Sequence, residues 1–239
     1  MLNLKRKKGP FQHTRKWFAV ESASSDCFRF VSYLQFQGEQ PPRGLLRKEF
    51  HTQLIDLTKS EELLLQSMKK NTCYEIRRAD KDGVAFTEET DLEKFRKFYN
   101  LFAHIKSLPA LHAHHLASIG SALRVTRAEI AHETLVMHAY LADPESSRAR
   151  LFLSASAIGG SDKSLCGRAN RGLHWYDMKF FKIRDYAVYD MGGIAMGNGN
   201  DSTRGIDHFK TGFGGTTVRE DHFHSPLAAL VASLMGKRL

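Results

Sequence analysis

Two strand patterns, a long helix pattern and a strand that ends in glycines follow one another in the second half of this chain. This order limits the fold more than any other feature. Residues 134–142 and 148–157 have strand patterns, and the spacer between them, Asp143-Pro144-Glu145-Ser146-Ser147, is rich in turn-forming residues, so a β-hairpin is predicted. Residues 162–184 have a helix pattern, and 187–190 read as a buried strand stopped by Met191-Gly192-Gly193. A hairpin followed by a helix and a strand predicts a mixed α/β (α+β) sheet with helices on its faces.

The rest of the chain adds strands and helices of the same mixed class. Strands are expected at residues 27–36, 50–57 and 216–223, and helices after an N-cap at Thr58 or Ser60, at 91–105, up to Lys210 and from Pro226 onward. A loop rich in Gly and Asn is expected at 197–201. No internal repeat is found. Residues 21–239 are therefore predicted to form a single domain, preceded by a flexible basic arm at residues 1–20.

The chain carries a formal net charge of +9, with 35 Lys and Arg against 26 Asp and Glu. A surplus of positive charge favours anionic partners such as nucleotides, RNA, phosphosugars or acidic lipid headgroups. The alternative is a charge that only keeps the protein dispersed. The basic arm contains no acidic residue up to Lys16 and lacks the apolar core of a secretion signal. It is a candidate for contact with phosphates or with the inner face of a membrane, and the alternative is a solvated tail.

Cysteine and histidine usage excludes several classes of site. Cys27, Cys73 and Cys166 are odd in number and contain no CxxC pair, which argues against a disulfide framework or a zinc ribbon and indicates a reducing compartment. A histidine-rich segment around His112 and His115 has no acid or cysteine at ligand spacing, so no metal site is predicted. No apolar run is long enough to span a bilayer. A cytoplasmic location is therefore expected.

The residues that suggest chemistry lie between Gly167 and Val218. Two glycine pairs at the ends of elements permit positive φ and a close approach of the backbone to a ligand. Lys210 and nearby arginines offer charge for phosphates or for a developing oxyanion. Under the alternative reading the glycines only make turns and Trp175 fills the core. Composition alone does not separate the two readings.

Two ordered motifs resemble a known family. Tyr189-Asp190-Met191-Gly192-Gly193 is followed by Gly205-Ile206 and by Phe209-Lys210 with Phe213-Gly214-Gly215, and the segment KKNTCYEIRRADKDGV spans residues 69–84. Together they resemble the carboxy-terminal half of the FemABX-type aminoacyltransferase domain. The motifs are short, but they lie far apart in the chain and occur in the family's order.

The resemblance implies a GNAT-like fold, in which split strands of a mixed, curved sheet open a cleft for an activated acyl donor. It implies transfer of an amino acid from aminoacyl-tRNA to an amine on a peptidoglycan or surface-polysaccharide precursor. By position, Lys210 lies beside the reacting carbonyl, where a cation stabilises the oxyanion. Asp190, with Asp177 as a second candidate, would assist deprotonation of the amine. The remaining predicted substrate-binding residues are Arg77, Arg168, Arg171, His174, Trp175, Tyr176, Gly192, Gly193, Phe209, Phe213, Gly214 and Gly215. The alternative for Asp190 is a loop anchor, and for Lys210 a surface ion pair.

The chain also departs from the family pattern. The best-known members carry two such domains and many add a coiled-coil arm, whereas this chain is expected to hold one domain, so a homodimer is a candidate to complete the acceptor site. The loop that cradles coenzyme A in ordinary GNAT acetyltransferases is not found. The segment 167–172 occupies its place with a different spacing, although its arginines could hold phosphate at a helix N-terminus.

No tightly bound cofactor is expected, and the donor is aminoacyl-tRNA or an acyl-CoA thioester. The leading hypothesis is an aminoacyl or acyl transferase that forms an amide on a nucleotide- or lipid-linked sugar or peptide acceptor. The alternatives are an acyl-CoA-dependent N-acyltransferase of a nucleotide sugar and a non-catalytic RNA-binding module.

Overall fold

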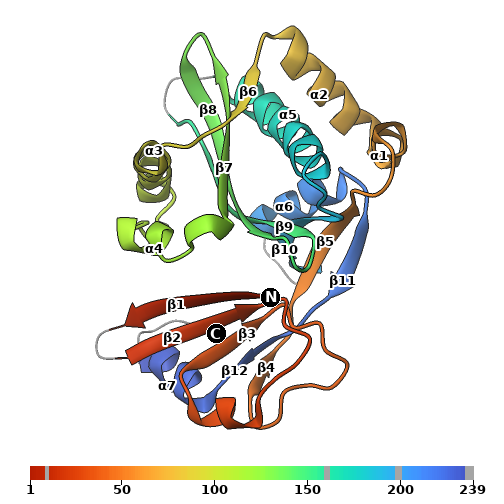
Figure 1. The fold of residues 1–239 in the computed structure, drawn as a ribbon. Helices are drawn as coiled ribbons and strands as arrows, with labels where there is room; N and C mark the ends of the chain where they lie inside the picture. Colours follow the sequence, from red (N-terminus) through yellow and green to blue (C-terminus); the bar gives the residue numbers. More distant parts are fainter. Residues whose placement is uncertain (9–10, 159–161, 197–200, 235–239) are drawn as a thin grey trace. The chain divides into compact units, whose positions relative to one another are not determined.

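The computed structural model describes residues 1–8, 11–158, 162–196 and 201–234, so most of the Gly- and Asn-rich loop expected at 197–201 lies outside the described residues. The chain divides into two compact units (Figure 1). Unit 1 consists of Met1–Thr52 with Thr217–Leu239, and unit 2 of Gln53–Thr216. This differs from the single domain expected from the sequence, because the C-terminal strand pairs with strands from the start of the chain.

Unit 1 contains a five-stranded sheet in the order β1-β2-β3-β12-β4. Its strands are β1 (Leu2–Lys8), β2 (Phe11–Trp17), β3 (Val31–Leu34), β4 (Leu46–Lys48) and β12 (His222–His224). A short 3-10 helix (Ser24–Phe28) and α7 (Pro226–Leu234) complete the unit. β2 and β3 are parallel, whereas the other neighbours are antiparallel.

The segment expected to be a flexible basic arm is instead a strand pair. β1 and β2 are antiparallel in continuous register from Leu2 opposite Trp17 to Lys8 opposite Phe11. Backbone hydrogen bonds form this pair whatever the side chains are, and Trp17 at its end is 5% exposed. The run of positive charge hid the alternation of Leu2 and Leu4, which is a strand signal.

His224 is a buried polar residue of the unit 1 sheet. Its Nδ1 lies 2.8 Å from the Ser32 hydroxyl. Burial, together with the positive charges of Lys48 and Arg15, lowers the pKa of His224 to about 4. The imidazole is therefore neutral at physiological pH.

Unit 2 is built on a seven-stranded sheet in the order β11-β5-β10-β9-β8-β7-β6. Its strands are β5 (His51–Asp56), β6 (Ala85–Glu88), β7 (Leu123–Ile130), β8 (Glu133–Asp143), β9 (Arg148–Ser156), β10 (Val188–Ile194) and β11 (Thr216–Arg219). β8 and β9 form the predicted hairpin, and β10 joins β9 in parallel. The single strand expected at 216–223 is divided between β11 here and β12 of the other sheet.

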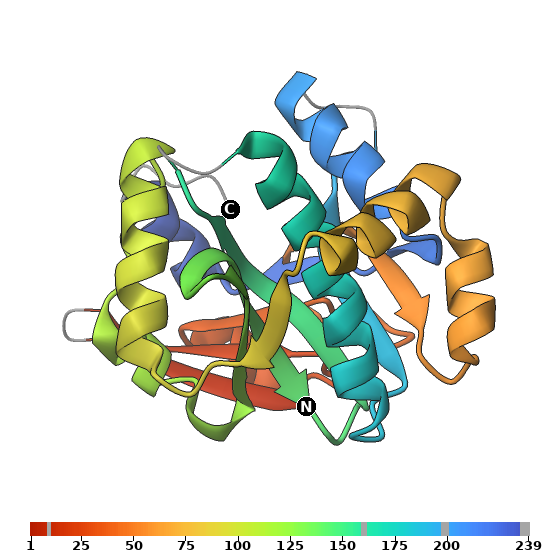
Figure 2. The same ribbon diagram turned by 90° about the horizontal axis from the view of Figure 1, so that it is seen from above.

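Helices lie on both faces of the unit 2 sheet. They are α1 (Glu61–Ser67), α2 (Lys70–Lys81), α3 (Leu92–Ile105), α4 (Ala113–Ala117), α5 (Lys163–Lys182) and α6 (Asp201–Thr211). α3 lies on one side of β7 and β8 and α5 on the other, and α2 packs across α5 (Figures 1 and 2). This is the mixed α/β architecture, with helices on both faces of the sheet, that the sequence predicts.

Two helices of unit 2 begin at residues whose side chains cap them, and Ser60 is one of the two caps predicted from the sequence for the first of them. The Ser60 hydroxyl accepts a hydrogen bond from Leu63 N at the start of α1, and the Asp162 carboxylate accepts one from Ser164 N at the start of α5. α5 then packs closely on α2 at Gly172, where an added Cβ would lie 3.1 Å from the Ala79 side chain.

The cysteines and helices bear on two further expectations. Cys27, Cys73 and Cys166 are all free thiols. Across the described ranges, every helix falls short of the length and apolar content needed to cross a lipid bilayer.

Candidate active site

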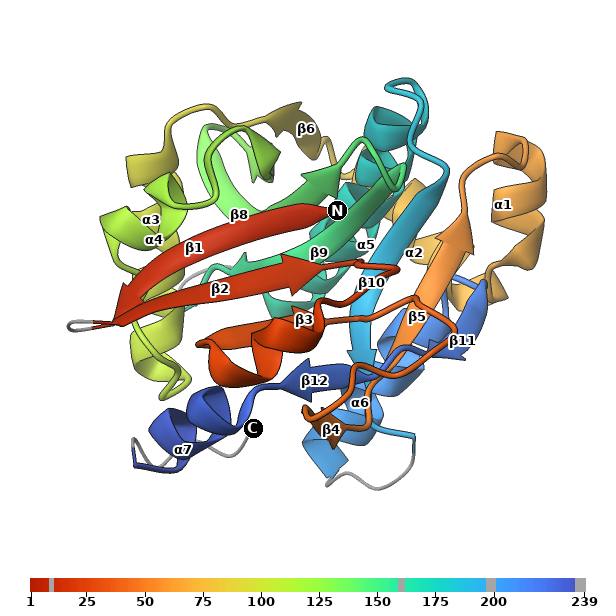
Figure 3. The ribbon, with the colours of Figure 1, turned by 60° about the horizontal axis from the view of Figure 1, so that its bottom comes forward.

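The site begins where two parallel strands separate. β9 and β10 are paired only from Arg148 opposite Val188 to Arg150 opposite Asp190, while β9 continues to Ser156 and β10 to Ile194. Figure 3 shows the two strands diverging beyond the paired part. The separation of two neighbouring strands that the resemblance implies is therefore present in this sheet.

Lys210 lies at the start of this divergence. It projects from α6 and donates a hydrogen bond from Nζ to the Gly193 carbonyl of β10, at 2.7 Å. Gly192 has φ +77°, and a Cβ added there would make an ordinary van der Waals contact with Nζ, at 3.7 Å, so the positive φ and not a lack of space favours glycine here. Burial and the nearby charge of Arg150 lower the pKa of Lys210 to about 8, against the opposing effect of Asp190 and Asp207. At neutral pH the side chain is a part-buried cation.

The Asp190 carboxylate is fully engaged in contacts with neighbouring groups of the protein. Its carboxylate is fully buried, lies 2.7 Å from a guanidinium nitrogen of Arg148 and 3.8 Å from one of Arg150, and accepts a hydrogen bond from Gly192 N at 2.7 Å. A carboxylate held by two arginines and a backbone N–H is a poor proton acceptor. The geometry therefore favours the alternative reading of Asp190 as an anchor, here of the end of β10 that carries Gly192 and Gly193.

Four of the predicted binding residues gather near Lys210. The Arg171 guanidinium lies 4.9 Å from the centre of the Phe209 ring. The His174 ring lies 5.5 Å from that of Phe209 and 5.1 Å from that of Phe213. Arg171 and His174 come from α5, whereas the phenylalanines come from α6 and the turn after it. The fold thus brings together two motifs that are more than thirty positions apart.

Two other predicted binding residues, both arginines, have different surroundings: one forms an ion pair within the protein and the other is exposed. Arg168 forms an ion pair with Asp82, at 2.6 Å, which ties α5 to the end of α2. Arg77 is exposed on α2, beside a small hollow of about 190 Å³.

Trp175 and Tyr176 pack along α5. The Trp175 ring lies 5.6 Å from the Lys179 ammonium, and the Tyr176 ring stacks at 6.0 Å on Phe86. Both are partly buried against the core of unit 2. The alternative reading of Trp175 as a packing residue agrees with these contacts.

The second glycine pair brings backbone close to backbone. Gly214 and Gly215 both have positive φ, and an added Cβ would lie 2.6 Å from the Ser67 carbonyl oxygen and 2.1 Å from that of Leu54, respectively. The close approach inferred from the sequence therefore exists, but the partner is the protein's own chain rather than a ligand.

A group of buried polar side chains adjoins the site. We call it the buried polar network, and it consists of Asn170, His138, Asp177, Tyr140, Tyr189 and His174. All but Asn170 are at most 2% exposed. The sequence analysis included His174 and Asp177 but missed His138, Tyr140 and Tyr189. A usable signal existed, because His138 and Tyr140 are polar residues two apart in an otherwise apolar strand, and such residues point to the same face.

Three members of the network also offer ligand atoms for a metal. One atom each of His138, His174 and Asp177 lies within 4.8 Å of the others. However, both ring nitrogens of His138 already have hydrogen-bond partners, and Asp177 Oδ2 has two. Hydrogen bonds thus account for this cluster without an ion.

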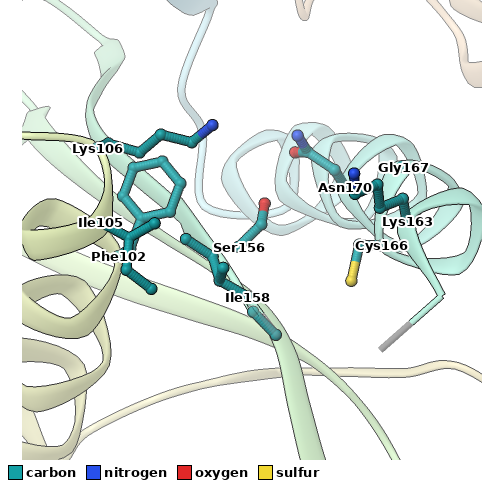
Figure 4. Close-up of a pocket in the computed structure, with 10 residues that line it drawn as sticks. Phe102, Ile105, Lys106, Ser156, Ile158, Lys163, Cys166, Gly167 and Asn170 are labelled. Atoms are coloured by element: carbon teal, nitrogen blue, oxygen red, sulfur yellow. The ribbon is translucent and has the colours of Figure 1, made fainter. Parts of the chain in front are cut away.

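A cavity of about 750 Å³ lies at the other end of the network (Figure 4). Phe102 and Ile105 of α3 and Lys106 directly after it border one side, and Lys163, Cys166 and Asn170 of α5 border the other. The lining is mainly apolar with two lysines, and Asn170 links it to His138 at 2.9 Å.

Known structures share this architecture. FemX matches with a TM-score of 0.69 at 12% identity, over 98% of this chain and 86% of the FemX chain. The C-terminal domain of a putative lysylphosphatidylglycerol synthetase from Agrobacterium fabrum matches with a TM-score of 0.63 at 13% identity, over 98% of this chain and 83% of that one.

The protein has a FemABX/GNAT-like fold.

A third match is L-PGS from Bacillus licheniformis, with a TM-score of 0.60 at 12% identity, over 99% of this chain and 86% of that one. At these identities the likeness establishes the fold and leaves activity to be argued from the site. No family model matches the sequence, and no curated protein matches it. The FemABX/GNAT-like fold nevertheless confirms the resemblance drawn from the two motifs.

Proposed function

We propose that this protein is an acyltransferase that moves an aminoacyl group from aminoacyl-tRNA to an amine of a cell-wall or surface-polysaccharide precursor. The neighbours named FemX and lysylphosphatidylglycerol synthetase support aminoacyl transfer as the class of reaction. The observation that carries the proposal is the position of Lys210. It is a part-buried cation at the point where β9 and β10 diverge.

The chemistry requires such a cation. Attack of an amine on an ester or thioester turns the carbonyl tetrahedral and places negative charge on its oxygen. A lysine ammonium has three N–H donors, and the described contacts of Lys210 use one of them, on Gly193. The other two are available to the oxyanion, and a preorganised donor of this kind typically contributes about 3 kcal/mol to the transition state.

The donor and acceptor follow from charge. Positive side chains lie at both ends of the buried polar network: Arg171 next to Phe209, and Lys106 and Lys163 at the apolar cavity. They favour an anionic donor with an apolar portion, which fits a charged tRNA or a CoA thioester with its acyl group. No tightly bound cofactor is part of the proposal. The acceptor is a nucleotide- or lipid-linked sugar or peptide. A lipid-linked acceptor would bring the protein to the inner face of the membrane, and a homodimer remains the proposed way to complete the acceptor site.

The test is product formation. Each reaction contains the protein, one donor and one acceptor. The donor is a mixture of aminoacylated tRNAs or of acyl-CoA thioesters, and the acceptor is an amine-bearing peptidoglycan precursor or phosphatidylglycerol vesicles. Products are identified by mass spectrometry. We expect transfer from tRNA to the precursor. Lys210→Met should lower kcat by about 10²- to 10³-fold, and Lys70→Met, at an exposed position of α2, should leave it unchanged. Unchanged turnover in Lys210→Met would refute the assignment of the site.

The same assay decides between the alternatives. Product from acyl-CoA alone, on a nucleotide sugar, would identify the coenzyme A-dependent N-acyltransferase. Tight RNA binding that weakens steeply with salt, with no product from any donor, would identify a binding module.

A further inference from the structure

The buried polar network continues from the cavity to the proposed acyl-transfer site. Its first half joins β8 to α5: Asn170 lies 2.9 Å from His138 Nε2, and His138 Nδ1 lies 2.7 Å from Asp177 Oδ2. Tyr140 donates its hydroxyl hydrogen to the same Asp177 oxygen, at 2.5 Å. The other carboxylate oxygen, Asp177 Oδ1, is buried without a hydrogen-bond partner among the described residues.

The second half of the network joins β8 to β10 and returns to α5. The hydroxyl oxygens of Tyr140 and Tyr189 are 2.7 Å apart, and Tyr189 lies 2.6 Å from His174 Nδ1. The contacts are therefore continuous from Asp177 to His174, and they pass through two tyrosines.

The number of hydrogens determines the direction of each bond. A tyrosine hydroxyl has a single hydrogen, and that of Tyr140 goes to the Asp177 carboxylate. Tyr189 must then be the donor to Tyr140. Its own hydrogen being used, Tyr189 can only accept from His174, so the hydrogen in that contact is on His174 Nδ1. The remaining ring nitrogen, His174 Nε2, keeps its lone pair.

The surroundings keep His174 neutral. Its ring is 2% exposed and is flanked by Phe209 and Phe213. Burial, followed by the electrostatic effect of His138 on β8 and the positive charges of Lys210 on α6 and Arg171 on α5, holds the pKa of His174 well below its usual range. Nε2 makes no hydrogen bond to any described residue. It is therefore a neutral acceptor on a ring that lies 5.5 Å from that of Phe209, the residue before Lys210.

We propose that His174 Nε2 is the base that takes the proton from the attacking amine, and that Tyr189, Tyr140 and Asp177 relay it. As the amine nitrogen bonds to the acyl carbon, the π electron pair of the carbonyl moves onto its oxygen, the N–H bond breaks and an Nε2–H bond forms. When the oxygen re-forms the carbonyl, the ester C–O bond breaks, and the tRNA oxygen leaves and takes a proton from solvent. His174 releases its Nδ1 hydrogen to Tyr189, Tyr189 passes its own to Tyr140, and Tyr140 passes its own to Asp177 Oδ2. The proton thus ends on the carboxylate, and the imidazole ends as the opposite neutral tautomer. This catalytic role rests on the proposed acyl transfer.

The relay removes an electrostatic obstacle. A histidine acting alone would become an imidazolium close to Lys210 and Arg171, and its low pKa makes that charge costly. Transfer through the two tyrosines places the proton on Asp177, next to His138, so no second cation forms at His174. The negative charge that the reacting centre gains lies on the oxyanion, beside Lys210.

The tautomer is tested first, because it does not depend on activity. In protein labelled with ¹⁵N-histidine, we expect the His174 resonances to show a protonated Nδ1 and an unprotonated Nε2 at pH 7, and Tyr189→Phe to disturb this assignment because the acceptor for Nδ1–H is lost. His174→Gln identifies the resonances. A protonated Nε2 in the wild-type protein would overturn the relay, whatever the enzyme does.

The kinetic test uses Tyr189→Phe, which keeps the ring and breaks the relay, with Tyr186→Phe on the nearby loop as the matched control. We expect kcat to fall about 10²-fold in Tyr189→Phe with little change in KM, and the control to match wild type. The defect should shrink as pH rises, because the amine then loses its proton to solvent. An equal loss at all pH values would indicate a merely structural role for Tyr189, and unchanged kcat would equally overturn the relay.

The two measurements also separate this inference from the proposed function. Wild-type protein that transfers no acyl group but shows the expected tautomer would refute the function, and with it the catalytic role. Active wild-type protein with the opposite tautomer, or with active Tyr189→Phe, would refute the relay alone.

Discussion

Lys210→Met should stabilise the folded protein at neutral pH while it removes activity. The pKa of Lys210 falls from 10.5 in the unfolded chain to about 8 in the folded protein, a difference of about 2.5. At about 1.4 kcal/mol for each pKa unit, the folded state loses about 3 kcal/mol by holding this ammonium in its site. Methionine has a similar shape and no charge, but it also gives up the hydrogen bond to Gly193, worth about 1 kcal/mol. The expected net gain at pH 7 is about 2 kcal/mol in the free energy of unfolding.

The pH dependence of this gain is a sharper test than its size. Below pH 8 the lysine is protonated in both states, and the full cost is present. Between pH 8 and 10.5 the unfolded chain binds more protons at this site than the folded one, so the stability of the wild type rises with pH by up to about 1.4 kcal/mol per unit. The advantage of Lys210→Met should therefore shrink above pH 8 and reverse near pH 10.

Urea unfolding followed by circular dichroism at pH 7 and pH 10 measures both effects. Lys70→Met is the matched control, because its exposed side chain loses little hydration on folding and reports the effect of methionine alone. A Lys210→Met variant that is less stable than wild type at pH 7, or a difference that is the same at both pH values, would refute the reasoning.

Two further predictions concern glycine geometry and acid sensitivity. Gly215→Ala should lower the free energy of unfolding by about 3 kcal/mol or more, because φ is +79° and the new Cβ would lie 2.1 Å from a carbonyl oxygen of β5. Gly192→Ala, with φ +77° and its nearest atom at 3.5 Å, should lower it by only about 1 kcal/mol. Comparable urea midpoints for the two variants would contradict this. The pKa of His224 is about 4 in the folded protein against 6.5 unfolded, so the unfolded state binds more protons between these values and stability should fall by up to about 3 kcal/mol as pH drops from 6.5 to 4. Urea unfolding at pH 7 and 4.5 should show this fall in wild type and a smaller one in His224→Asn, and equal slopes would show that His224 is not responsible.

The sequence by itself determined the local elements and their order. The turn-rich spacer after residue 142 predicted the β8–β9 hairpin, and the apolar pattern predicted α5. The expectation that Met191-Gly192-Gly193 stops the next strand was wrong, because β10 continues through both glycines to Ile194. The hairpin and the helix depend on residues close together in the chain, so period and turn chemistry suffice to recognise them. The position of Lys210 was predicted as well, but through the resemblance rather than through local pattern.

Tertiary structure alone decided which groups meet and how they are charged. His138 and Asp177 are 39 positions apart, yet their side chains touch because β8 passes beneath α5. Asp190, a candidate base in the sequence, is held by Arg148 from the neighbouring strand. Proton affinity depends on burial and on the charges within a few ångströms. Those are set by packing between distant segments, which no local pattern in the chain records.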